Sequence, residues 1–122
     1  MNKTLEQREI DFMVKHNTIF SYLNLYNNKS TLLSYYEDGD YYSAHQDASV
    51  LTAVTHIFKE PQTFQGGDLL FPDFNGEIKV RNNHTVIFPG MINHSVTKVT
   101  MNDEDLNKKY GRFCMTQFLH FR

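Results

Sequence analysis

From residue 31 onward the chain is a succession of short segments rich in β-forming residues and separated by turn signals. The Asn75-Gly76 pair favours a tight hairpin, and the Pro89-Gly90 pair ends a strand. The segments alternate with turns rather than with helices, which argues against a parallel α/β architecture. Roughly eight strands at this spacing predict an all-β sandwich or barrel, and a jelly roll is the most economical way to close them. The predicted strands span residues 31–36, 41–47, 50–58, 68–71, 77–80, 84–88, 91–99 and 111–121.

A helical brace is predicted before these strands, over about residues 4–28. Thr4 and Gln7 have the spacing of a capping box, and apolar residues then recur on one face as far as residue 15. We therefore expect a helix over residues 5–15 that packs against the outside of a sheet. Residues 18–26 have no clear period and fit either a strand or a second short helix. The polar runs 27–30 and 37–40 are predicted to be turns, and residues 59–65 and 100–109 to be loops.

The length, charge and cysteine content of the chain limit the classes of function. A sequence of 122 residues predicts one domain, residues 1–122, with its jelly-roll core over about residues 31–121. The net charge of −2 provides no basic field for nucleic acid or an anionic membrane. A single cysteine, Cys114, rules out an internal disulfide and suits a reducing compartment. Without a signal-peptide core or a membrane-spanning run, the expected location is the cytoplasm.

The tripeptide His45-Gln46-Asp47 carries the strongest chemical signal. Its histidine and aspartate are two positions apart, so on a β-strand both side chains point to one face. His94 is a third candidate ligand. Two histidines and one carboxylate form the facial triad of non-haem Fe(II) oxygenases, which leaves coordination positions open. An H-x-D pair alone is a weak signal, and its weight comes from the residues around it.

The last predicted strand supports this interpretation. Strand alternation places Arg112, Cys114, Thr116 and Phe118 on one face. A guanidinium in so apolar a strand needs a partner, because an unpaired buried charge is costly. A nearby cationic fork of this kind could hold the far carboxylate of a chelating co-substrate. The alternative is a surface charge on an edge strand.

Four motifs, in order, resemble those of the Fe(II)/2-oxoglutarate-dependent dioxygenases, in their prolyl 4-hydroxylase-like branch. The resemblance covers roughly residues 31–121 and implies a double-stranded β-helix fold, a cupin-like jelly roll. The motifs are Y-x-x-G-x-x-x-x-x-H-x-D at residues 36–47, G-G-x-L-x-F-P at residues 66–72, F-P-G-x-x-x-H-x-V at residues 88–96 and G-R-x-x-x-T at residues 111–116.

The resemblance also implies an activity. It identifies His45, Asp47 and His94 as ligands of Fe(II), and Arg112 as the partner of the distal carboxylate of 2-oxoglutarate. The implied reaction couples oxidative decarboxylation of 2-oxoglutarate to succinate and CO₂ with hydroxylation of a C–H bond. It uses O₂, with ascorbate as a candidate reductant.

Three further positions match the family less closely. Tyr36 corresponds to a pocket tyrosine, or is a core ring with its hydroxyl at the rim. Thr116 would add a hydroxyl to the carboxylate site or line the pocket. His56 stands where relatives often carry a tyrosine that binds the co-substrate, and it fits either that role or a filler. Cys114 is interpreted as a small buried hydrophobe.

Several functions remain to be weighed. Within the family, a prolyl or other peptidyl substrate is the first choice. A nucleic-acid demethylase is less favoured because Phe118 stands where that branch has a second arginine. The alternative outside enzymes is a non-catalytic β-helix module that binds a metal or small ligand. The chain is short for the family, so residue 1 need not be the natural start, and a partner subunit could complete the domain.

Overall fold

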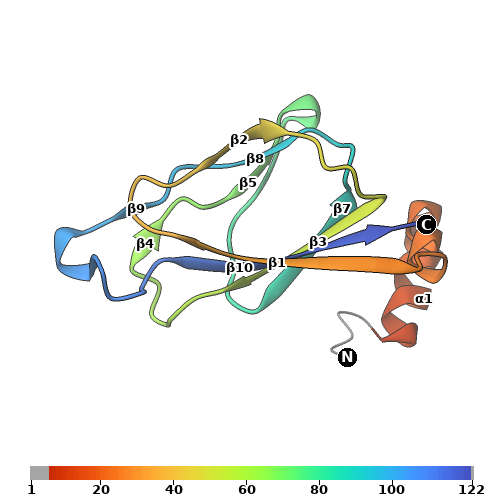
Figure 1. Ribbon diagram of the computed structural model, residues 1–122, viewed down its shortest axis with the longest axis horizontal. Helices are drawn as coiled ribbons and strands as arrows, with labels where there is room; N and C mark the ends of the chain where they lie inside the picture. The colour runs from red at the N-terminus through yellow and green to blue at the C-terminus, as the bar shows by residue number, and fades with distance from the viewer. Residues whose placement is uncertain (1–5, 122) are drawn as a thin grey trace.

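The computed structural model describes residues 6–121, whose core is built from two four-stranded antiparallel sheets that face each other (Figure 1). The major sheet has the strand order β1-β10-β3-β7, and the minor sheet has the order β2-β8-β5-β6. The major sheet comprises β1 (Asn28–Tyr36), β10 (Arg112–His120), β3 (Leu51–Ile57) and β7 (His84–Pro89); the minor sheet comprises β2 (Tyr42–His45), β8 (His94–Val96), β5 (Leu69–Phe71) and β6 (Gly76–Ile78). This arrangement confirms the predicted all-β core.

The connections contain small elements that the sequence pattern did not predict. Residues of the two predicted loops pair with each other, as β4 (Phe64–Gln65) and β9 (Thr100–Met101). Two short 3-10 helices, η2 (Pro72–Phe74) and η3 (Asp103–Asp105), follow β5 and β9. The hairpin at Asn75 is confirmed, with a left-handed backbone (φ 55°) before β6.

Helix α1 (Gln7–His16) and the 3-10 helix η1 (Thr18–Asn24) lie at one end of the sheets, beside the C-terminus (Figure 1). The helix begins two residues later than expected, because Glu6 is its N-cap and pairs reciprocally with Glu9. Gln7 instead donates to Asp11 and Asn24. The predicted cap Thr4 and the predicted start at residue 5 lie outside the described residues. Within the described part of the chain, no helix is long and apolar enough to cross a membrane.

Strand β1 corrects the predicted turn at residues 27–30. The strand already begins at Asn28, which pairs with His120 of β10, and the pairing continues without a break to Tyr36 and Arg112. The polar composition of this segment favours a turn locally, but the ladder to β10 provides backbone partners for an extended chain. The jelly-roll core therefore begins three residues earlier than expected.

Strand β10 buries opposite faces at its two ends. Near its start, Cys114 belongs to a cluster between the sheets that includes Val54 and Leu69. Near its end, Leu119 packs in a second cluster with Ile10 of the helix. The helix therefore braces one end of the major sheet, as predicted, and leaves the space between the sheets to the functional residues.

Candidate metal centre

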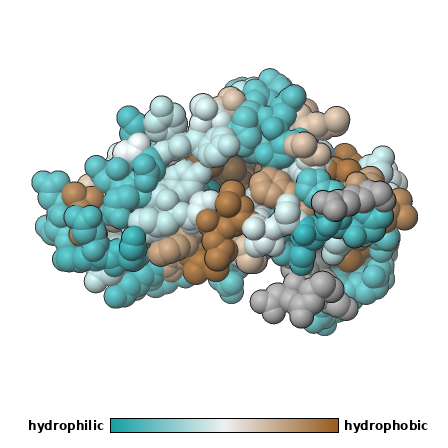
Figure 2. Space-filling view, in the orientation of Figure 1, coloured by the Kyte–Doolittle hydropathy of each residue, from teal (hydrophilic) through white to brown (hydrophobic). Residues whose placement is uncertain are grey.

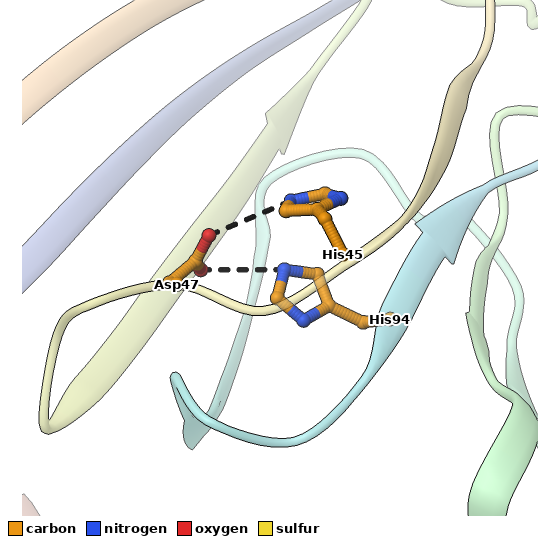
Figure 3. Close-up of side chains that lie close together, drawn as sticks. All are labelled: His45, Asp47 and His94. Atoms are coloured by element: carbon orange, nitrogen blue, oxygen red, sulfur yellow. Dashed lines mark ion pairs between the residues drawn. The ribbon is translucent and has the colours of Figure 1, made fainter.

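Three side chains meet between the sheets at the end of β2 (Figure 3). His45 and His94 are direct cross-strand partners on β2 and β8, with ring centroids 4.3 Å apart. Asp47 follows β2 and points back at both rings. Its Oδ1 lies 3.5 Å from Nε2 of His45, and its Oδ2 lies 3.2 Å from Nε2 of His94. The three ligand atoms lie within 4.8 Å of one another, close enough to share one metal ion.

The backbone determines which imidazole nitrogen is free to bind a metal. Nδ1 of His45 lies 2.7 Å from the Ser43 carbonyl oxygen, and Nδ1 of His94 lies 2.7 Å from the Ile92 carbonyl oxygen. Because a carbonyl only accepts, each Nδ1 must donate a hydrogen. Each Nε2 then carries the lone pair and faces the carboxylate. Both rings are therefore held in the tautomer that a metal requires.

Two buried hydroxyls hold Asp47 in place, and sequence reasoning did not identify them. Thr52 donates from Oγ1 to Asp47 Oδ2 over 2.8 Å, and Oγ of Ser49 lies 2.7 Å from the Thr52 hydroxyl. The backbone N–H of Asp47 donates to the Gly90 carbonyl over 2.7 Å. A side chain at Gly90 would collide with the Ser49 backbone, which explains the glycine here. In the sequence, the sign of this role was two polar residues, Ser49 and Thr52, around the start of the apolar strand β3.

Replacing Thr52 by valine is expected to weaken metal binding about tenfold, at the lower end of the effect typical of residues behind a metal ligand. The substitution preserves shape but removes the hydroxyl that orients Asp47. Anaerobic calorimetry with Fe(II) measures the change. Thr55→Val is the matched control, because the Thr55 hydroxyl lies on the exposed side and bonds to Thr85, away from Asp47. Equal affinities in both variants would contradict this role.

A cavity of about 90 Å³ adjoins the three side chains. Its wall includes the whole predicted face of β10, with Arg112, Cys114, Thr116 and Phe118. Tyr36 also lines it. The cavity thus brings together all of the predicted site residues except His56, which contacts Arg112 but does not line the cavity.

Arg112 is the largest fully buried side chain, with 1% of its surface exposed. Its guanidinium lies over the Tyr36 ring, 4.6 Å from the centroid. Nη2 lies 2.9 Å from Nε2 of His56, whereas Nε and Nη1 are buried without a hydrogen-bond partner among the described residues. Burial raises the pKa of Tyr36, an effect that Arg112 partly offsets, so the phenol stays neutral. The site therefore presents unused cationic donors to the cavity.

The double glycine of the second motif makes room for this arginine. At Gly67 (φ +74°) an added Cβ would lie 2.6 Å from Cδ of Arg112. At Gly66 (φ +77°) it would collide with the Lys98 carbonyl oxygen. Both positions also have a left-handed backbone that disfavours other residues. Gly67 thus serves the site by allowing the segment before β5 to approach the Arg112 side chain closely.

Burial lowers the pKa of His56 to about 4 from its ordinary 6.5, and the charge of Arg112 adds to this effect. Asp68 opposes the shift without cancelling it. The ring is therefore neutral at physiological pH.

This shift predicts an acid-sensitive fold. The unfolded chain takes up the His56 proton near pH 6.5 and the folded chain only near pH 4, so stability falls as the pH drops through that window. The full loss is roughly 3 kcal/mol. Urea unfolding of wild type and His56→Gln between pH 7 and pH 4 measures it, since other groups cancel in the comparison. Parallel pH curves for the two proteins would contradict the prediction.

Comparison with known proteins agrees with this geometry. Residues 31–120 match the family described as the 2OG-Fe(II) oxygenase superfamily. A PKHD-type hydroxylase from Parvibaculum lavamentivorans is 32% identical over 79 residues, covering 53% of this chain and 35% of the relative. The chain thus matches about a third of that relative's length. A crystal structure of a Pseudomonas putida prolyl-4-hydroxylase has a TM-score of 0.58 at 16% identity, covering 100% of this chain and 71% of the other.

The structural likeness confirms the predicted double-stranded β-helix fold, and the family match extends over most of the chain. The chain therefore belongs to the 2OG-Fe(II) oxygenase superfamily.

Proposed function

We propose that this chain is an Fe(II)- and 2-oxoglutarate-dependent hydroxylase with His45, Asp47 and His94 as its iron ligands and Arg112 as the anchor of 2-oxoglutarate. One observation carries the proposal: a two-histidine, one-carboxylate cluster shares a cavity with a buried arginine that has unused donors. We also propose that residues 1–122 act as a single domain, which the shared core of the two sheets supports.

The donor set fits Fe(II). Two neutral imidazole nitrogens and one carboxylate suit divalent iron and its neighbours in the first transition row. The backbone carbonyls that hold each Nδ1–H, and the Thr52 hydroxyl on Asp47, provide the orienting contacts that such ligands need. When bound, iron supplies the redox chemistry by which O₂ oxidises 2-oxoglutarate and the substrate. Ascorbate as reductant remains a prediction.

The cavity fits a dicarboxylate that chelates a metal at one end. Arg112 would pair with the far carboxylate through charge-assisted hydrogen bonds, a geometry that lysine does not reproduce. Thr116 also lines the cavity and would contribute its hydroxyl, while the Tyr36 ring holds the guanidinium from one side. Burial of the guanidinium excludes water and so strengthens this recognition.

A peptidyl substrate, with proline as the first candidate, is supported by the mouth of the site. Tyr42 is 48% exposed, lines the cavity and packs against His45 in a tilted arrangement, with ring centroids 4.0 Å apart. A hydrophobic patch interrupts the hydrophilic surface near the middle of the molecule, where β1 runs (Figure 2). Two leucines of that strand are exposed: Leu32 lines the cavity, whereas its neighbour Leu33 points to the opposite face. An aromatic and apolar rim suits a proline-containing peptide better than a polyanion. The two similar proteins, a PKHD-type hydroxylase and a prolyl-4-hydroxylase, agree with this choice.

The test of this function begins without a substrate. Anaerobic protein is titrated with Fe(II) and then with 2-oxoglutarate, and the weak visible charge-transfer band of the chelate is recorded. We expect a saturable band. Bound iron without a band would refute the oxygenase proposal and favour a metal-binding module. A folded protein that binds no iron would favour an incomplete domain that a partner subunit completes. Proline-containing peptides are then screened for succinate release and for the gain of one oxygen atom.

A further inference from the structure

The guanidinium of Arg112 is confined on three sides within the fold. The Tyr36 ring covers one face, Gly67 leaves no room for a side chain beside Cδ, and His56 meets Nη2 at 2.9 Å. His56 forms a directional hydrogen bond with the charged group. Its ring is 1% exposed and does not line the cavity.

The direction of this hydrogen bond follows from the chemistry of the two groups. A guanidinium only donates, so Nε2 of His56 must accept. The ring hydrogen then lies on Nδ1, and the ring is uncharged. The charged neighbours agree with this state. Arg112 on β10 disfavours a second positive charge on His56. The oxygens of Asp68, before β5, accept hydrogen bonds from the Val80 N–H and from Lys79. His84, the cross-strand partner of His56 on β7, is exposed, and its Nδ1 lies 2.9 Å from the Asn82 carbonyl oxygen.

The hydrogen bond to His56 uses one of the five guanidinium N–H groups and leaves others available to a ligand. Nε and Nη1 are buried and have no hydrogen-bond partner within residues 6–121. Because Arg112 lines the cavity, an arriving carboxylate can take these donors without displacing His56. Because His56 contacts Nη2, it does not compete with a ligand for the hydrogens on Nε and Nη1.

We infer that His56 is a positioning residue that acts through Arg112: its neutral Nε2 holds one guanidinium N–H so that the remaining donors face the distal carboxylate of the co-substrate. The inference rests on the proposed function. It differs from direct binding of the co-substrate by His56, because the ring does not line the cavity and its Nε2 accepts a hydrogen bond from Arg112 instead of donating one.

Two variants and a shorter ligand separate this role from a structural one. His56→Leu removes the acceptor, whereas His56→Gln offers an amide oxygen in its place. Dissociation constants are measured from the charge-transfer band of anaerobic Fe(II) protein with 2-oxoglutarate and with pyruvate, a 2-oxo acid without a distal carboxylate. The matched control is His84→Leu, which removes the exposed cross-strand histidine.

We expect His56→Leu to weaken 2-oxoglutarate binding roughly 10- to 100-fold, the range for losing a hydrogen bond to a charged group. Pyruvate binding should be unchanged, and His56→Gln should remain within about threefold of wild type. Imidazole ¹⁵N NMR of the wild type at neutral pH should show a neutral Nδ1–H ring for His56. This spectrum tests the inference even if the leucine variant does not fold.

Several results would overturn the inference. One is a His56 ring that is charged or carries its hydrogen on Nε2. Another is wild-type affinity of His56→Leu for 2-oxoglutarate. The inference also fails if this variant loses affinity for 2-oxoglutarate and pyruvate equally, or if both His56 variants lose the same affinity for 2-oxoglutarate. Failure of the proposed function gives a different result, because the wild type itself would then show no chelate band.

Discussion

Replacement of Arg112 by alanine is expected to weaken 2-oxoglutarate binding at least about a hundredfold and to leave Fe(II) binding nearly unchanged. Removing one partner of a buried, hydrogen-bonded charge pair typically has an effect of this size. The guanidinium lies in a cavity wall with 1% of its surface exposed, so water cannot substitute for it. Anaerobic titration of the chelate band measures co-substrate affinity, and calorimetry with Fe(II) alone measures metal affinity.

Two further variants, one at Arg112 and one at an exposed arginine, are compared with Arg112→Ala. Arg112→Lys keeps the charge but loses the fork, so its affinity should lie between those of wild type and alanine. Arg81→Ala removes an exposed arginine and should bind 2-oxoglutarate as wild type does. If the dissociation constant of Arg112→Ala for 2-oxoglutarate were within threefold of the wild-type value, another residue would bind the distal carboxylate.

Replacement of Asp47 by alanine is expected to lower Fe(II) affinity more than about a hundredfold, beyond the 10- to 100-fold effects of residues behind a ligand. Asp47 is the only carboxylate of the cluster, and its two oxygens face both histidines. Asp47→Asn keeps the shape and removes the charge, so it separates electrostatic attraction from steric fit. Calorimetry with Fe(II) under anaerobic conditions is the measurement.

The control for this series is Asp73→Ala, which removes an exposed carboxylate in η2. Its metal affinity should equal that of wild type. If Asp47→Ala bound Fe(II) as tightly as this control, the metal would occupy a different site, and the role proposed for His45 and His94 would be wrong as well.

Much of the fold and the composition of the cavity could be predicted from local patterns. Alternation along residues 112–118 identified one face of β10, and all four side chains of that face line the cavity. The cluster of His45, Asp47 and His94 could be predicted because few residue types bind iron. The strand predicted to carry both His45 and Asp47 ends at His45, so the chain after β2, and not strand alternation, brings Asp47 to the histidines. Their roles as ligands stay predictions until metal is titrated.

The remainder depended on contacts between distant segments. Asn28 has turn-forming neighbours, yet pairing with His120 makes it the start of a strand. The Thr52 hydroxyl on Asp47 and the His56 acceptor on Arg112 have no local pattern, since each depends on where another strand places its side chain. The pairing of β4 with β9 joins two segments that each have the composition of a loop.

The two halves of the site belong to different sheets. The histidines lie on adjacent strands of the minor sheet, and Arg112 lies on the major sheet. A dicarboxylate held at both ends would staple the sheets together, so metal and co-substrate should each raise the affinity for the other by the same factor. In a melting experiment the increase in unfolding temperature with both ligands should exceed the sum of the separate increases. Hydrogen exchange should then slow in β8 and β10 alike. The stability of the two-sheet core would therefore report whether both the metal and the co-substrate are bound.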